Sequence, residues 1–126
     1  MFEYNCTIKR VIDGDTVVAD VDLGFTVHVE VHFRLAGINA PELVGADAAA
    51  GRASKVALER MLGQMPSDGS PITVTTPSPI VVRSSKPLTT DKYGRWLGRF
   101  FYGGVLDVNQ AMVDGGFASP YPGVNS

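Results

Sequence analysis

Residues 27–35, Val-His-Val-Glu-Val-His-Phe-Arg-Leu, form the most regular strand pattern in the chain. Apolar and polar side chains alternate through the whole stretch, which is the period of two that a half-buried β-strand shows. The pattern predicts that the valines, Phe33 and Leu35 face the interior and that Arg34 lies on the polar face. A strand of this kind needs neighbouring strands that supply the rest of its core.

Two such strands are predicted on the N-terminal side, at residues 5–12 and 16–23. The turn Asp13-Gly14-Asp15 separates them, and Gly24 marks the next turn. Connections this short favour an antiparallel meander of three strands. The apolar positions that share one face of the second strand are Val17, Ala19, Val21 and Leu23.

The pattern changes to a helical one from Asp47 onwards. Apolar residues recur at i, i+3, i+4 and i+7 from Leu58 to Met65, so we expect an amphipathic helix that Pro66 ends. The other expected elements are strand pieces at 72–76 and 80–83, a strand at 96–102, a helix at 108–114 between its cap Asp107 and Gly115-Gly116, and a loose tail from about residue 120.

This element order predicts a mainly β protein with helices (α+β), in which five strands close an OB-fold barrel and a helix caps one end. The 126 residues fit one domain, residues 1–126, since typical domains have roughly 100–150 residues. With 44% hydrophobic and 19% charged residues, the chain can bury a core.

Composition also excludes several classes of function. The single cysteine, Cys6, excludes an intramolecular disulfide and a multi-cysteine zinc site, and its apolar surroundings indicate a buried thiol. The apolar runs are too short to span a membrane, and the first residues lack the regions of a secretory signal. The formal net charge is −2, so a nucleic-acid partner must be held by a local basic cluster.

Three polar segments follow or precede predicted strands and are expected to meet at one rim of the barrel. They are Asp13-Gly14-Asp15-Thr16, the stretch from Arg34 to Glu42, and Asp91-Lys92-Tyr93-Gly94-Arg95. Each alone is also an ordinary turn or a solvated strand face. Their occurrence together, in this order, indicates a site.

These residue types match what cleavage of a phosphodiester requires. Charge builds on the non-bridging oxygens, and the planar guanidinium groups of Arg34 and Arg95 suit them. A hard cation held by oxygen ligands such as Asp15 would neutralise the same charge. A carboxylate such as Glu42 could accept a proton from the attacking water.

The chain resembles the staphylococcal nuclease (thermonuclease-like) family from about Thr7 to Phe117. The resemblance rests on Val11 to Val17, on Phe33-Arg34-Leu35 with Ala40-Pro41-Glu42, on Thr90 to Arg95, and on Val108 to Val113 followed by two glycines. It implies an OB-fold and a Ca²⁺-dependent, largely sequence-nonspecific nuclease. The implied substrates are single- or double-stranded DNA and RNA, cleaved to 3′-phosphate ends.

The resemblance also implies roles for individual residues. Arg34, Glu42 and Arg95 match the catalytic residues, with the two arginines on the phosphate and Glu42 as general base. Asp15 and the backbone oxygen of Ala40 match calcium ligands, and Asp13 lies just outside them. Asn39 stands where the best-known members carry a second aspartate ligand. The residues that match substrate contacts are Lys92, Tyr93 and Tyr121.

Two rival interpretations stay open. On the same fold, the chain could be a catalytically weak or inactive module that binds nucleic acid or protein, and Asn39 is the feature that favours this alternative. A purely structural barrel would leave the clustered charges unexplained. We expect a monomer without a membrane partner.

Overall fold

The element order follows the sequence pattern in most of the chain. The structure is a computed structural model that describes residues 2–64, 68, 80–84, 95–103 and 106–121. In chain order the elements are β1 (Phe2–Asp13), β2 (Thr16–Gly24), β3 (Val27–Leu35), β4 (Ile38–Asn39), the short 3₁₀ helix η1 (Gly45–Asp47), α1 (Ala48–Met61), β5 (Ile80–Ser84), β6 (Trp96–Tyr102), β7 (Leu106–Asp107), α2 (Val108–Asp114) and β8 (Ser119–Pro120).

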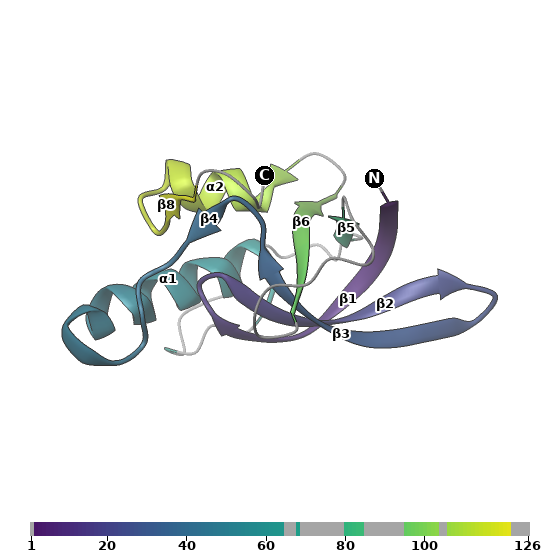
Figure 1. The fold of residues 1–126 in the computed structure, drawn as a ribbon, viewed down its shortest axis with the longest axis horizontal. Coiled ribbons are helices and arrows are strands. Elements are labelled where there is room, and N and C mark those ends of the chain that lie inside the picture. The colour runs from purple at the N-terminus through teal and green to yellow at the C-terminus, as the bar shows by residue number, and fades with distance from the viewer. Residues whose placement is uncertain (1, 65–67, 69–79, 85–94, 104–105, 122–126) are drawn as a thin grey trace.

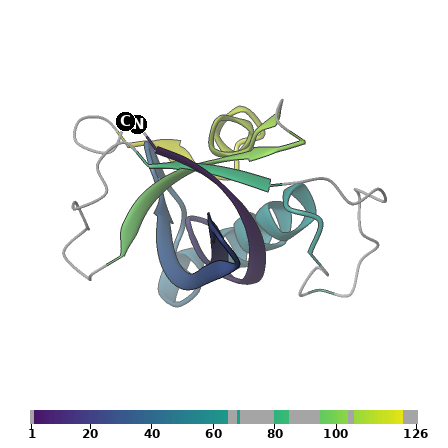
Figure 2. The same ribbon diagram turned by 90° about the vertical axis from the view of Figure 1, so that its right-hand side faces the viewer.

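Five of the strands close a barrel. β1 pairs with β2 and β2 with β3, both antiparallel, which confirms the predicted meander. The last residues of β3 then pair in parallel with β6, β6 pairs with β5, and β5 returns to β1. Figures 1 and 2 show these strands from two directions. The prediction of a mainly β, OB-type barrel with helices is therefore confirmed.

Closure depends on the length and bending of β1. Its first residues, from Phe2 to Cys6, pair with β5, whereas its second half pairs with β2. The register against β2 shifts between Ile8 and Arg10, and such bulges bend a strand and increase its twist. One strand can therefore serve two neighbours that lie on different sides of the barrel.

Both helices contribute to the core that fills the barrel. α1 supplies Leu58, while α2 supplies Met112, and both side chains are fully buried. Phe33 of β3 and Phe100 of β6 meet edge to face, with ring centroids 5.4 Å apart. Cys6 is buried, as predicted, and its burial raises the pKa of the thiol to about 12, which makes it unreactive.

The end of α1 differs from the expectation. The helix ends at Met61 rather than at Pro66, which lies outside the described residues. Gly63 adopts φ +73°, and the N–H of Gln64 donates to the carbonyl of Glu59 at 2.8 Å. This is a glycine-terminated helix end, so the conformational freedom of Gly63 stops the helix. Neither described helix is long and apolar enough to cross a membrane.

The prediction that every apolar residue of residues 27–35 faces inward was wrong for the first half of the strand. Phe33 and Leu35 are buried, but Val29 is 42% and Val27 52% exposed. The last residue of β2 that pairs with β1 is Val21, so the β2–β3 hairpin continues beyond the barrel (Figure 1). Alternation identifies the two faces of a strand, but it does not show what covers them.

The remaining elements mostly agree with the sequence. β6 and α2 have the predicted bounds, and the Asp107 side chain accepts a hydrogen bond from the Gln110 N–H. The expected strand piece at 72–76 lies outside the described residues. Pro120 at the expected start of the loose tail pairs with Ile38, and residues 122–126 are not described.

Candidate active site

The Asp13-Gly14-Asp15 turn lies between β1 and β2 and is packed against α1. Gly14 is in close contact with this helix and with Ala40. A Cβ atom at this position would lie 1.8 Å from Ser54 Oγ and 2.8 Å from the Ala40 Cβ. The N–H of Asp15 donates to Asp13 Oδ1 at 3.0 Å, which is the usual hydrogen bond of an aspartate turn. The turn therefore holds Asp15 in a fixed position at the start of β2.

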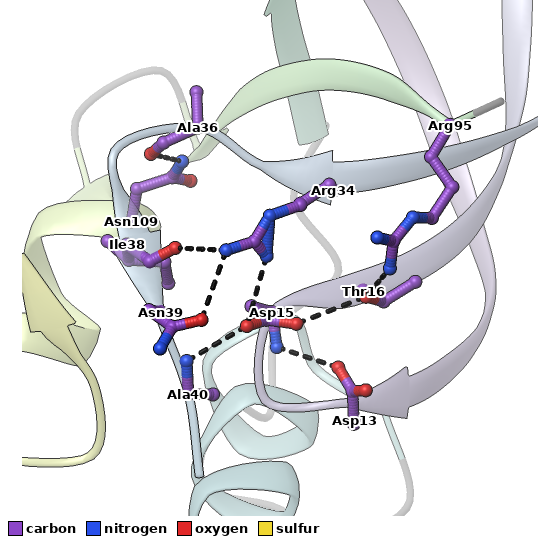
Figure 3. A network of polar contacts seen from close by, with 10 residues as sticks. All are labelled: Asp13, Asp15, Thr16, Arg34, Ala36, Ile38, Asn39, Ala40, Arg95 and Asn109. Atoms are coloured by element: carbon purple, nitrogen blue, oxygen red, sulfur yellow. Dashed lines mark hydrogen bonds and ion pairs between the residues drawn. The ribbon is translucent and has the colours of Figure 1, made fainter. Parts of the chain in front are cut away.

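Asp15 forms a buried ion pair with Arg34. Arg34 Nη1 lies 3.2 Å from Asp15 Oδ2, and the two side chains are only 11% and 10% exposed. The backbone brings them together, since Thr16 pairs with Arg34 in the β2–β3 ladder. The same Oδ2 accepts the Ala40 N–H at 2.8 Å. The predicted metal ligand and the predicted phosphate-binding arginine are therefore direct partners (Figure 3).

Arg34 also joins β3 to the segment that follows it. Its Nη2 donates to the Ile38 carbonyl at 3.0 Å and to Asn39 Oδ1 at 3.2 Å. The Tyr121 ring lies against the same guanidinium, with 5.3 Å from Arg34 Cζ to the ring centroid. Arg34 thus has oxygen atoms of Asp15, Ile38 and Asn39 around it.

Arg95 reaches the same place from the start of β6. Its Nη1 donates to Thr16 Oγ1 at 3.1 Å, and the Thr16 hydroxyl donates to Asp15 Oδ1 at 3.1 Å. The two arginines therefore contact adjacent residues of one chain segment, although they are far apart in sequence (Figure 3). β6 pairs with the end of β3, which places the beginning of β6 beside Arg34.

Asn109 on α2 fixes the connection that carries Asn39. Its side chain is fully buried and donates to the carbonyls of Ala36, at 2.8 Å, and Gly98, at 3.1 Å. It also accepts the Phe100 N–H at 3.1 Å. Three buried backbone groups of β6 and of the segment after β3 are satisfied by this one amide.

β8 lies on the other side of the segment that follows β3 and carries Asn39. It pairs with β4, and the N–H of Tyr121 donates to the Gly37 carbonyl at 2.8 Å. The C-terminal segment is therefore fixed beside Asn39. This pairing brings the Tyr121 ring to Arg34, although Pro120 and Pro122 flank the residue in sequence.

The Asp13 carboxyl group is partly buried and lies beside Asp15. Burial raises the pKa of Asp13 to about 6, the side chain and charge of Asp15 act in the same direction, and the hydrogen bond from the Asp15 N–H opposes them. Two carboxylates in such proximity repel each other when both are ionised, and a nearby cation relieves this repulsion. The Arg34 guanidinium is such a cation beside Asp15.

The oxygen atoms of this network could hold a hard cation only if neutral oxygens, from amide or carbonyl groups, act as ligands beside the carboxylate. Within the described ranges, no group of three or more His, Cys, Asp or Glu side chains is placed to hold a metal ion. Asp15 Oδ2 and Asn39 Oδ1 nevertheless face a common cation, the Arg34 guanidinium. Carboxylate and amide oxygens are ligands that calcium accepts. The Ala40 contact with Asp15 is through its N–H, so a role for its carbonyl stays a prediction.

The other predicted site residues either make no described side-chain contact or lie outside the described residues. Glu42 is exposed, and among the described residues its carboxylate has no hydrogen-bond or ion-pair partner. It follows Ala40 by two residues and therefore lies close to the network along the chain. Lys92 and Tyr93 lie outside the described residues. Their predicted roles stay predictions, as does the role of Glu42.

Sequence reasoning missed the residues that hold this network together. Thr16 connects Arg95 to Asp15, Asn109 ties α2 to β6, and Ser54 packs on Gly14. In the sequence Thr16 belongs to a turn motif at the start of a predicted strand, and Asn109 belongs to a predicted helix, so neither pattern indicates these contacts. An asparagine among the apolar residues of a short helix is the signal that could have pointed to a buried polar role.

A methyl group at Gly14 is expected to destabilise this arrangement. Gly14→Ala would push against Ser54 Oγ, a fully buried atom without a hydrogen-bond partner among the described residues, and against Ala40. We expect a loss of about 1–3 kcal/mol of unfolding free energy, measured by urea denaturation. Gly14→Ala combined with Ser54→Ala should recover part of the loss, whereas an additive double mutant would contradict this packing.

A comparison with protein-family models identifies the family of the chain. The model for staphylococcal nuclease homologues matches residues 32–126, which is 95 of the 126 residues. The chain therefore belongs to this family. The matched range includes Arg34, Asn39, Glu42 and Arg95, and it begins after the Asp13-Gly14-Asp15 turn. No curated protein matches the chain in a sequence search.

Proposed function

We propose that this member of the staphylococcal nuclease homologue family is a Ca²⁺-dependent, largely sequence-nonspecific nuclease. It hydrolyses phosphodiester bonds of DNA and RNA to 3′-phosphate ends. The observation that supports the proposal best is the meeting of Arg34 and Arg95 at the adjacent residues Asp15 and Thr16. Two permanently charged guanidinium groups beside one carboxylate can bind a negatively charged group such as a phosphate.

The proposed reaction is the attack of water on phosphorus. Glu42 accepts a proton of the water, the bond from phosphorus to the 5′-oxygen breaks, and the leaving 5′-oxygen takes a proton from solvent, which gives a 3′-phosphate and a 5′-hydroxyl. Arg34 and Arg95 donate hydrogen bonds to the non-bridging oxygens as their charge increases. The exposed position of Glu42 is compatible with contact to water.

Asp15, Asn39 and the carbonyl of Ala40 would hold the calcium ion, with Asp13 close to them. When bound, the ion would neutralise charge on the phosphate and orient it. Arg34 contacts one oxygen of Asp15 and the side-chain oxygen of Asn39. A cation held by these two side chains would therefore compete with the Arg34 guanidinium, which would then be available to a phosphate.

A cleavage assay tests the proposal. The protein is incubated with heat-denatured DNA in calcium or in chelator, beside Glu42→Gln and the control Glu3→Gln, which alters an exposed glutamate paired with Arg83. We expect cleavage only with calcium and a loss of about a hundredfold in Glu42→Gln, because general-base catalysis contributes roughly 10²–10⁴-fold. Cleavage that persists in chelator would contradict the proposal.

The main alternative is a binding module without catalysis. Two features favour this alternative. Asn39 is neutral where the best-known members of the family carry a charged aspartate, and the Glu42 carboxylate has no partner among the described residues. Under this alternative the wild type would bind denatured DNA but would leave it intact under every metal condition. The same assay therefore separates the two functions.

Calcium affinity is expected to depend on Asn39. Asn39→Asp adds a carboxylate beside Asp15, so we expect calcium to bind about tenfold more tightly, or ~1.4 kcal/mol, by isothermal titration calorimetry. Asn5→Asp adds the same charge at an exposed position of β1 and serves as the control. Equal calcium affinities in the wild type, Asn39→Asp and Asn5→Asp would show that Asn39 is not part of the calcium site.

A further inference from the structure

The β2–β3 arm, defined here as residues 21–31, has an unpaired strand edge. β1 pairs with β2 only as far as Val21, and β6 pairs with β3 only from Phe33. Within the described part of the chain, residues 27–32 of β3 therefore have no strand paired on their outer side. Figure 1 shows the hairpin extending away from the other elements. An open edge of this kind can pair with another strand.

The arm also exposes apolar side chains next to this edge. Leu23, Val27 and Val29 are exposed, and Phe25 at the tip is 97% exposed. Phe25 and Thr26 have φ values of 55° and 61°, a conformation that costs free energy in residues other than glycine. Leu23 and Val29 line a shallow groove of about 170 Å³ that extends to Trp96. Exposed apolar surface of this kind marks an interaction site.

The orientation of the backbone determines which residues can pair at the edge. The Leu35 N–H donates to the Asp15 carbonyl, so the odd-numbered residues of β3 direct their backbone groups toward β2. The backbone groups of His28, Glu30 and His32 consequently point to the open edge. Their side chains share the polar face, whereas the valines share the apolar face.

We propose that the arm binds a second copy of this chain, with the two β3 strands antiparallel and Val29 opposite Val29 of the second copy. In this register His28 lies opposite Glu30 of the second copy, and Val27 lies opposite Val31. On the polar face a histidine that can donate a hydrogen bond therefore meets a carboxylate, and on the apolar face valines meet, which is a favourable arrangement for cross-strand pairs. The interface is a two-fold one, as in most homodimers.

The neighbouring registers are less favourable. A shift that centres the pair on Glu30 places two carboxylates opposite each other. A shift that centres it on Val31 places the second strand against residues 33–35 of β3, where β6 already pairs. The register through Val29 extends only from Val27 to Val31 and leaves β6 in place.

Charge also favours a second copy over nucleic acid at this surface. The polar face of the arm carries Asp20, Asp22 and Glu30, and Asp20 Oδ2 lies 3.1 Å from His28 Nδ1. These carboxylates repel phosphate groups. In the dimer, by contrast, His28 would have Asp20 of its own chain on one side and Glu30 of the second copy on the other.

Disulfide trapping tests the register. Val29→Cys should form a covalent dimer under mild oxidation, because residues directly opposite have Cβ atoms roughly 4.5–5.5 Å apart. Val27→Cys, on the same face, should link at least tenfold more slowly, since it lies opposite Val31 rather than opposite itself. The wild type should stay unlinked, because its only cysteine is buried. Equal trapping at positions 27 and 29 would overturn the register.

Sedimentation equilibrium tests the dimer itself. The wild type should show a dimer whose fraction rises with concentration, and Val29→Lys should weaken association at least tenfold. Val44→Lys, which changes a valine that is 76% exposed outside the arm, should associate like the wild type. A wild type that stays monomeric up to about millimolar concentration, or equal effects of both lysines, would overturn the proposal.

This inference is independent of the proposed nuclease activity. Val21, the partner of Val29, is five residues from Thr16 along β2, or about 17 Å at roughly 3.4 Å per residue. The centre of the proposed interface therefore lies away from Asp15 and Arg34. A monomeric but active protein would contradict only the dimer, and a dimer without cleavage would contradict only the nuclease.

Discussion

Replacing Arg34 with alanine is expected to lower kcat/KM for DNA cleavage by about 10³-fold, or ~4 kcal/mol. The guanidinium contacts Asp15, Ile38 and Asn39, so it lies at the centre of the proposed site. An arginine that stabilises charge on a transferring phosphate contributes roughly 10³–10⁵-fold in other phosphoryl-transfer enzymes. Initial rates on denatured DNA, at saturating calcium, measure the effect.

The same substitution is expected to lower stability. Asp15 would lose its charged partner while its side chain stays only 10% exposed. Removing one member of a buried ion pair costs roughly 3–5 kcal/mol, and we expect ~3 kcal/mol because Thr16 and Ala40 still donate to the carboxylate. Arg83→Ala is the matched control, since Arg83 pairs with Glu3 on the surface. It should cost less than about 1 kcal/mol and leave cleavage unchanged.

Calcium binding separates a specific effect of Arg34 from general damage. In the wild type, the guanidinium contacts an oxygen of each of the two side chains that are proposed to bind calcium, Asp15 and Asn39. Arg34→Ala removes this competing cation, so calcium should bind at least as tightly as in the wild type, although cleavage is lost. If calcium affinity falls together with activity, Arg34 supports the structure of the site rather than the reaction.

Much of the fold could be predicted because its signals are local. The alternation in residues 27–35, the aromatic strand at 96–102 and the capped helix at 108–114 all depend on neighbouring residues, and their bounds agree with the structure. What covers a strand face depends on partners far along the chain. Val27 and Val29 therefore have the sequence pattern of buried residues but are exposed on the arm.

The candidate site likewise combines residues that could be predicted from sequence with contacts that could not. Arg34, Asp15 and Arg95 could be chosen from sequence, because the chemistry of phosphate binding restricts the residue types. Their supporting contacts could not, since the bond from Arg95 joins it to Thr16, 79 residues earlier. Asn109 likewise binds Ala36, 73 residues earlier. Contacts of this range leave no periodic pattern in the sequence.

Asn109→Ala is expected to cost about 3–5 kcal/mol of unfolding free energy. The substitution removes the hydrogen bonds to Phe100, Ala36 and Gly98. It leaves the buried Phe100 N–H and the partly buried Ala36 carbonyl without their present partner, whereas the Gly98 carbonyl still accepts the Ala36 N–H. Each unsatisfied buried group costs roughly 1–3 kcal/mol, and the lost side-chain volume adds a cavity. Urea denaturation followed by circular dichroism measures the change.

The effect should extend from the core to the proposed site, because Asn109 fixes the segment that carries Ile38 and Asn39. At a temperature where Asn109→Ala is fully folded, we therefore expect weaker calcium binding as well as slower cleavage. Gln110→Ala is the matched control on the same helix, since the Gln110 amide contacts only the exposed Asp114 among the described side chains. It should change stability by less than about 0.5 kcal/mol. Normal calcium binding in folded Asn109→Ala would show that this amide supports the barrel alone and has no part in positioning Asn39.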